Sequence, residues 1–142
     1  MRIMAIDYGD ARTGVAVSDA SGILTGYTTV IQSRRPETVA EEIAALVPAH
    51  GVEVLVMGFP RNMDGTESLR ADLYRSFAAL LEERTGLKPV LWDERRTTIE
   101  AHAILSASGK RTKRHKKNVD AVAASLILDG YLRFLAGRSS IE

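Results

Sequence analysis

The sequence of 142 residues predicts an α/β fold, in which helices flank a five-stranded mixed sheet. Three β-rich segments follow one another over residues 3–32 and are separated by short turn-like links. Helical patterns then alternate with two short apolar runs. Because a helical crossover joins parallel strands of one sheet, we expect an antiparallel meander of three strands continued by two parallel strands.

The first half of the chain supplies four strands and one helix. Residues 3–7 form a short apolar run, residues 14–19 alternate in polarity, and residues 25–32 are rich in β-branched side chains. Pro36 suits the first turn of a helix, whose apolar stripe ends before Gly51. Residues 52–57 are almost wholly apolar, as expected for a strand covered on both faces.

The second half supplies one further strand and three helices. A helix is expected over residues 66–84 with Gly86 as its C-cap, followed by a strand over residues 90–93. Capping-box spacing at residues 97–100 predicts a short helix that ends near residue 106. A basic loop then leads to a final helix, which Asn118 would cap.

Composition indicates a globular protein with 45% apolar and 26% charged residues. We expect one domain over residues 1–142, with a flexible tail at 137–142. The absence of cysteine excludes disulfides, thiolate metal sites and thiol nucleophiles. No segment resembles a secretory signal or a membrane span, so a cytoplasmic location is expected.

Three acidic residues, Asp7, Glu94 and Asp120, stand where predicted elements begin or end. The first two follow strands whose carboxyl ends should lie at one edge of the sheet, where open α/β folds bind ligands. The final helix would bring Asp120 to the same edge if it packs in that direction. Carboxylates suit hard divalent cations such as Mg²⁺ or Mn²⁺, and such ions support phosphodiester hydrolysis.

Each acid also has an ordinary structural interpretation. Asp7 could cap a hairpin turn. Asp120 could simply be an acid in the first turn of a helix, a position that the helix dipole favours. Neighbouring strand residues face opposite sides, so only one of Asp93 and Glu94 should face the site; we favour Glu94 and keep Asp93 in reserve. Asp120 shares a helical face with Ala123 and Ala124, which favours an inward position for its carboxylate.

Basic side chains near these acids suggest contact with a polyanion. Arg61 or Asn62 could face substrate from the turn before the second helix, and Arg95 and Arg96 could bind phosphate with charge-assisted forks. Residues 110–117 hold six Lys or Arg and no acid. Without this segment, 13 basic residues remain against 18 acidic ones, a net charge of −5. The basic residues of this segment are Lys110, Arg111, Lys113, Arg114, Lys116 and Lys117.

Taken together, these motifs resemble the YqgF/RuvX family of Holliday-junction-resolvase-like proteins and pre-16S ribosomal RNA nucleases. The matching segments are residues 6–9 (Ile-Asp-Tyr-Gly), 14–19 (Gly-Val-Ala-Val-Ser-Asp), 58–65 (Gly-Phe-Pro-Arg-Asn-Met-Asp-Gly), 93–98 (Asp-Glu-Arg-Arg-Thr-Thr), and Arg12 and Asp120. The resemblance implies a ribonuclease-H-like fold, catalytic metal-binding carboxylates at Asp7, Glu94 and Asp120, and a phosphate contact at Arg12. This chain departs from the family pattern at Ala11, where a lysine is usual, and at Arg96, where an apolar residue is usual.

The expected function is a Mg²⁺- or Mn²⁺-dependent nuclease acting on structured nucleic acid. The resemblance favours processing of the 5′ end of pre-16S rRNA, as a monomer or homodimer. Three alternatives stay open: a Holliday-junction DNA resolvase, a catalytically weak RNA- or ribosome-binding module, and an actin-like nucleotide-binding protein.

Overall fold

A computed structural model describes residues 1–22, 24–60, 70–93 and 113–141, with residues 113–119 and 138–141 described as backbone only. The short helix expected near residues 97–106 lies outside this part of the chain. No helix among the described residues has the length and apolar character needed to cross a membrane.

The centre of the molecule is a five-stranded mixed sheet in the order β3-β2-β1-β4-β5. Strands β1 and β2, and then β2 and β3, pair antiparallel, whereas β4 runs parallel to both β1 and β5. The expected meander and the two helical crossovers are therefore confirmed. The strands are β1 (Arg2–Asp7), β2 (Arg12–Ser18), β3 (Thr25–Gln32), β4 (Val52–Phe59) and β5 (Val90–Asp93).

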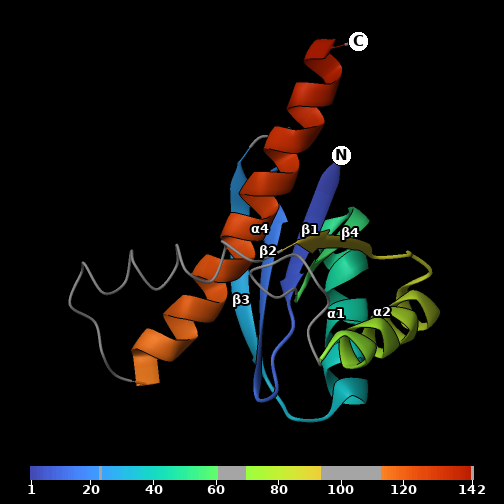
Figure 1. Ribbon diagram of the computed structural model, residues 1–142, viewed down its shortest axis with the longest axis vertical. Helices are drawn as coiled ribbons and strands as arrows, with labels where there is room; N and C mark the ends of the chain where they lie inside the picture. The colour runs from blue at the N-terminus through green and yellow to red at the C-terminus, as the bar shows by residue number, and fades with distance from the viewer. Residues whose placement is uncertain (23, 61–69, 94–112, 142) are drawn as a thin grey trace.

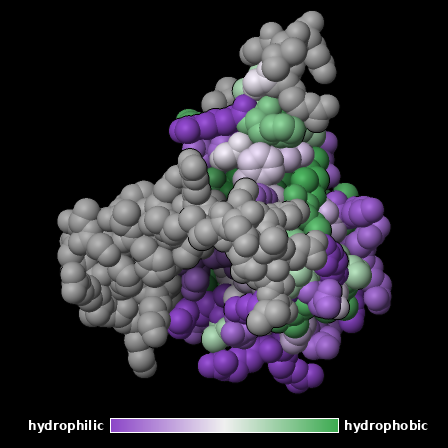
Figure 2. Space-filling model, in the orientation of Figure 1, coloured by the Kyte–Doolittle hydropathy of each residue, from purple (hydrophilic) through white to green (hydrophobic). Residues whose placement is uncertain are grey.

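Helices cover both faces of this sheet. Helices α1 (Pro36–His50) and α2 (Ala71–Thr85) lie on one face, and the long helix α4 (Lys113–Ile141) crosses the other and extends past the sheet at its C-terminal end (Figure 1). The surface over α1 and α2 is mainly hydrophilic, as expected of helices that bury only one side (Figure 2).

Alternation along β1 divides the core into two apolar layers. Ile3 and Ala5 pack in the layer beneath α4, whereas Met4 and Ile6 pack in the layer beneath α1 and α2. All four side chains are buried. The same alternation determines which face of the sheet the last residue of β1, Asp7, occupies.

Helix boundaries differ from the sequence prediction in three places. Arg70 is a turn residue immediately before α2, so the helix does not run unbroken from residue 66. Helix α4 begins at Lys113, which makes residues 113–117 helical and puts Asn118 inside the helix instead of at its cap. Lys and Arg are good helix formers, so a basic composition does not stop a helix. The helix also continues to Ile141, through most of the expected flexible tail.

Candidate metal and catalytic site

Asp7 is the last residue of β1 and is half-buried. Strand alternation with Ile3 and Ala5 puts it on the α4 face of the sheet. Across the antiparallel pair it lies opposite Gly14 of β2. The acid therefore stands at the carboxyl end of the central strand, where the resemblance predicts a metal ligand.

Helix α4 comes very close to the sheet at Gly14. A Cβ atom added to Gly14 would lie 2.1 Å from the carbonyl oxygen of Asp120 and 3.4 Å from the Cβ atom of Ala124. Only a glycine leaves room for this approach. Since Gly14 pairs with Asp7, the helix backbone at Asp120 passes directly over the neighbour of the first acid.

Small residues on α4 complete this contact. Ala123, Ala124 and Ile127 are all buried, which confirms the helical face predicted for them. Position 120 belongs to that face and its side chain is 24% exposed, between core and solvent. The sheet and helix therefore bring Asp7 and Asp120 to one region, although they are far apart in the sequence.

Arg12 supplies a cation in the same region. Its Nε atom donates a hydrogen bond to Oδ2 of Asp120 at 3.2 Å, and the two side chains are 32% and 24% exposed. Arg12 opens β2 and shares the sheet face of Gly14 by strand alternation. Arg12, which the resemblance predicts to contact phosphate, therefore contacts the predicted catalytic carboxylate of Asp120 in this structure.

The third predicted ligand, Glu94, lies outside the described residues. Its neighbour Asp93 ends β5 opposite Phe59, and Trp92 packs in the layer beneath α4. Asp93 is therefore on the opposite face from Asp7 by alternation, which argues against it as the alternative ligand. Within the described part of the chain, no three acidic or histidine side chains form a metal-sized cluster.

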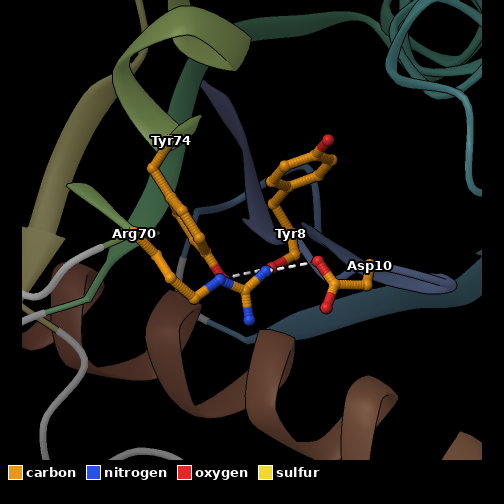
Figure 3. A network of polar contacts seen from close by, with 4 residues as sticks. All are labelled: Tyr8, Asp10, Arg70 and Tyr74. Atoms are coloured by element: carbon orange, nitrogen blue, oxygen red, sulfur yellow. Dashed lines mark hydrogen bonds and ion pairs between the residues drawn. The ribbon is translucent and has the colours of Figure 1, made fainter. Parts of the chain in front are cut away.

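The loop after Asp7 is fastened to α2 (Figure 3). The Tyr74 hydroxyl donates a hydrogen bond of 2.6 Å to the carbonyl oxygen of Tyr8, and Arg70 forms an ion pair of 2.5 Å with Asp10. The Tyr8 ring stacks on Phe77 with ring centroids 3.8 Å apart. Burial, together with the nearby Asp10 carboxylate, raises the pKa of the Tyr8 phenol. Sequence patterns gave no sign of the contacts between this loop and α2.

Two aromatic residues close to the predicted site in the sequence, Tyr8 and Phe59, lie in the core. Tyr8 is 6% exposed and Phe59 is 2% exposed, so neither ring is available to a base. Both pack in the layer beneath α1 and α2. Trp92 packs against Tyr131 of α4, as core packing predicts.

The basic residues predicted to bind nucleic acid fall into two groups. Arg61, Arg95, Arg96, Lys110 and Arg111 lie outside the described residues. Lys113, Arg114, Lys116 and Lys117 belong to the first turns of α4, of which the backbone alone is described. The helix that carries Asp120 therefore begins in the basic segment, which links the predicted polyanion contact to the carboxylate site.

The donor chemistry of the region suits a hard divalent cation. Asp7 and Asp120 offer carboxylate oxygens, the ligand type that Mg²⁺ and Mn²⁺ prefer. Asp120 already holds one cationic group, the guanidinium of Arg12. Mg²⁺ is usually bound through one or two protein carboxylates with substrate phosphate and water, so two acids on one face fit such an ion.

Sequence comparison identifies related bacterial proteins of similar length. The chain is 42% identical over 134 residues to a protein of Carboxydothermus hydrogenoformans, covering 94% of this chain and 97% of the relative. A Halothermothrix orenii protein is 41% identical over 134 residues, with 94% and 96% covered. Both relatives are provisionally named pre-16S rRNA nucleases.

Solved structures share the fold at low sequence identity. Thermus thermophilus RuvC, in complex with a Holliday junction, superposes with a TM-score of 0.57 at 14% identity, over 94% of this chain and 96% of RuvC. The large terminase nuclease of phage G20c superposes with a TM-score of 0.58 at 12% identity, over 92% and 81%. The family described as RuvX, Holliday junction resolvase, matches residues 1–134. By this match and the identity to its relatives, the chain belongs to the RuvX family.

Proposed function

We propose that the protein is a divalent-metal-dependent nuclease of the cytoplasm whose catalytic carboxylates are Asp7, Glu94 and Asp120. The observation that carries the proposal is the close approach of α4 to β2 at Gly14, beside Asp7 and beneath Asp120. A carboxylate pair on one sheet face, next to a guanidinium, has the composition of a phosphodiesterase site. Family membership and the relatives' names support the same reaction class.

The roles of the residues follow from their positions. Asp7 and Asp120, with Glu94, would hold Mg²⁺ or Mn²⁺, which when bound supplies Lewis-acid stabilisation of the phosphate and an activated water. Arg12 would offer its guanidinium N–H groups to a phosphate oxygen of the substrate. The sheet and α4 keep the two described carboxylates in fixed relative positions, so orientation adds to the rate.

Structured RNA is the proposed substrate, specifically the 5′ end of pre-16S rRNA. The names of relatives at 41–42% identity support it. A four-way DNA junction is the competing substrate, supported by the family description and by the ligand of the RuvC structure. Metal–carboxylate sites act on both polymers, so the choice between them needs an assay of cleavage on both.

An Asp120→Asn variant tests the catalytic assignment. We expect cleavage in Mg²⁺ to fall at least about 100-fold, since losing one carboxylate removes roughly 3 kcal/mol of electrostatic stabilisation. Asp129→Asn is the matched control, because Asp129 lies on the same helix and pairs with Arg133 at 3.1 Å. It should cleave like the wild type. Equal rates for Asp120→Asn and Asp129→Asn would refute the assignment.

Replacing Lys113, Arg114, Lys116 and Lys117 together by Gln tests the basic segment. Each phosphate contact that these substitutions remove should reduce the steepness of log affinity against log salt by about 0.7–0.9. We expect weaker binding of both substrates, with unchanged kcat once substrate saturates. Filter binding at several salt concentrations measures the slope. An unaltered slope would remove the segment from the nucleic-acid interface.

A binding module without catalysis is the second candidate. Under this alternative, the four Gln substitutions would abolish function, whereas Asp120→Asn would leave it intact. The pair of variants therefore separates the two functions in one experiment. The carboxylate arrangement favours catalysis, because acidic side chains on the binding surface of the protein do not raise its affinity for a polyanion.

A further inference from the structure

Helix α2 holds the loop that follows Asp7 at three points. The aromatic ring of Tyr8 stacks on Phe77 with an interplanar angle of 7° and meets the edge of Tyr74 at 5.5 Å. The carbonyl group of Tyr8 accepts the hydrogen bond from Tyr74. Asp10 pairs with Arg70, the residue before the helix. Figure 3 shows Tyr8, Asp10, Arg70 and Tyr74 together, with Tyr74 reaching the loop from α2 and Arg70 from the position just before it.

The Tyr8 carbonyl lies one residue beyond Asp7, so the hydrogen bond from Tyr74 acts close to the proposed ligand. Both hydrogen-bonding groups are buried, at a separation of 2.6 Å. Gly9 follows immediately, and a Cβ atom added there would lie 2.3 Å from the carbonyl oxygen of Arg12. The loop therefore has little freedom on the side of Gly9, and Tyr74 fixes the peptide on the side of Asp7.

The same loop also leads into β2, which carries Arg12 and Gly14. A shift of the Tyr8 peptide would move the end of β1 relative to the start of β2. The end of β1 holds Asp7, and the start of β2 holds Gly14, which lies against the backbone of Asp120. The α2 contacts thus support the site from the sheet face opposite α4.

We propose that Tyr74 is a positioning residue for Asp7, acting through the hydrogen bond from its hydroxyl to the Tyr8 carbonyl. The inference rests on the proposed function, in which Asp7 is a metal ligand. Groups that orient metal ligands without touching the metal typically contribute about 10- to 100-fold to metal affinity or activity. The ring of Tyr74 packs in the core, and its hydroxyl orients the loop; the two roles can be separated by removing the hydroxyl alone.

A Tyr74→Phe variant removes the hydroxyl and keeps the ring. We expect the affinity for Mn²⁺ alone, measured by titration calorimetry, to fall about tenfold. We also expect kcat to fall about tenfold with KM little changed, because Tyr74 does not contact substrate. Amide hydrogen exchange at Gly9 and Asp10 should become faster. The melting temperature should fall by roughly 2–4 °C, as for one buried hydrogen bond in a domain of this size.

Thr85→Val is the matched control, because it removes a hydroxyl from the opposite end of the same helix. The Thr85 hydroxyl donates to the Leu81 carbonyl oxygen at 2.6 Å, a contact as short as that of Tyr74, and accepts a hydrogen bond from the Leu87 N–H at 3.1 Å. We expect a similar fall in melting temperature without a change in Mn²⁺ affinity. If the two variants match in Mn²⁺ affinity, kcat and loop exchange, Tyr74 is merely structural and the inference fails.

A third protein, Asp7→Asn, distinguishes this failure from failure of the proposed function. If Asp7→Asn loses Mn²⁺ binding while Tyr74→Phe keeps it, Asp7 is a ligand and only the role of Tyr74 is overturned. If the wild type and Asp7→Asn bind Mn²⁺ equally, Asp7 is not a ligand, and both the proposed function and this inference are overturned.

Discussion

Replacing Asp7 by Asn is expected to lower metal-dependent cleavage about 1,000-fold. The amide keeps the size of the side chain and removes its charge, so the strand pair with Gly14 should persist while the metal ligand disappears. Metal ions contribute several kcal/mol to phosphoryl transfer, and each 1.36 kcal/mol changes the rate tenfold, so about 4 kcal/mol gives this loss. Single-turnover cleavage in Mg²⁺ and Mn²⁺ measures it.

The control for this variant is Asp72→Asn. Asp72 is an exposed acid in the first turn of α2, with Arg75 as its neighbour at 3.7 Å. Its removal changes the net charge by the same amount as Asp7→Asn, far from the α4 face. The control should cleave at the wild-type rate. An Asp7→Asn protein that is folded and as active as the control would exclude Asp7 from the chemistry.

Replacing Gly14 by Ala is expected to destabilise the fold by about 3 kcal/mol and to abolish cleavage. The new Cβ would meet the carbonyl oxygen of Asp120 at 2.1 Å and its carbonyl carbon at 2.7 Å. Both are backbone atoms, so relief requires the whole helix to move. That movement would carry Asp120 away from Asp7. Urea unfolding gives the stability, and the same cleavage assay gives the activity.

Gly137→Ala on α4 is the control for the effect of a glycine-to-alanine change where the new methyl group meets no close neighbour. Among the described residues, no atom outside the adjoining helix backbone lies within 4 Å of the Cβ position at Gly137, and the residue is helical. Alanine should therefore stabilise the helix by roughly 0.5–1 kcal/mol through helix propensity. If Gly14→Ala unfolds at the same urea concentration as the wild type, α4 does not approach β2 as closely as described.

The sheet could be predicted because local patterns determine it. Short links over residues 3–32 leave little choice but a meander, and the helices around β4 require crossovers that make β1, β4 and β5 parallel. The buried face of α4 followed from Ala123, Ala124 and Ile127, whose spacing repeats every helical turn. These features depend on periodicity, which is visible in the sequence.

Helix α4 begins earlier than predicted because the helix propensity of Lys and Arg outweighs the repulsion among their charges. Lys and Arg form helices well, and no glycine or proline separates Lys113 from Asp120. Repulsion among like charges on a helix costs only tenths of a kcal/mol per pair, which the packing of α4 further along can offset. The basic segment is therefore partly helical.

Long-range side-chain contacts lay beyond sequence reasoning. The pairs Arg12–Asp120 and Arg70–Asp10 join residues 108 and 60 positions apart. No periodicity links such partners, because only the packed fold brings them together. The role of Gly14 was hidden for the same reason: its sequence context indicates a strand, and its need to be glycine comes from the helix above it.

A cleavage assay on single and double carboxylate variants tests the central claim most directly. The proteins are Asp7→Asn, Glu94→Gln, Asp120→Asn, and the doubles Asp7→Asn/Asp120→Asn and Asp7→Asn/Glu94→Gln, each with pre-16S rRNA and a four-way DNA junction. Residues that act as one unit give strongly non-additive losses. We predict that the wild type cleaves one of the two substrates. On that substrate, each double variant should cleave no more slowly than the slower of its two single variants. Losses that multiply in the double variants would show that the three acids do not form one catalytic centre.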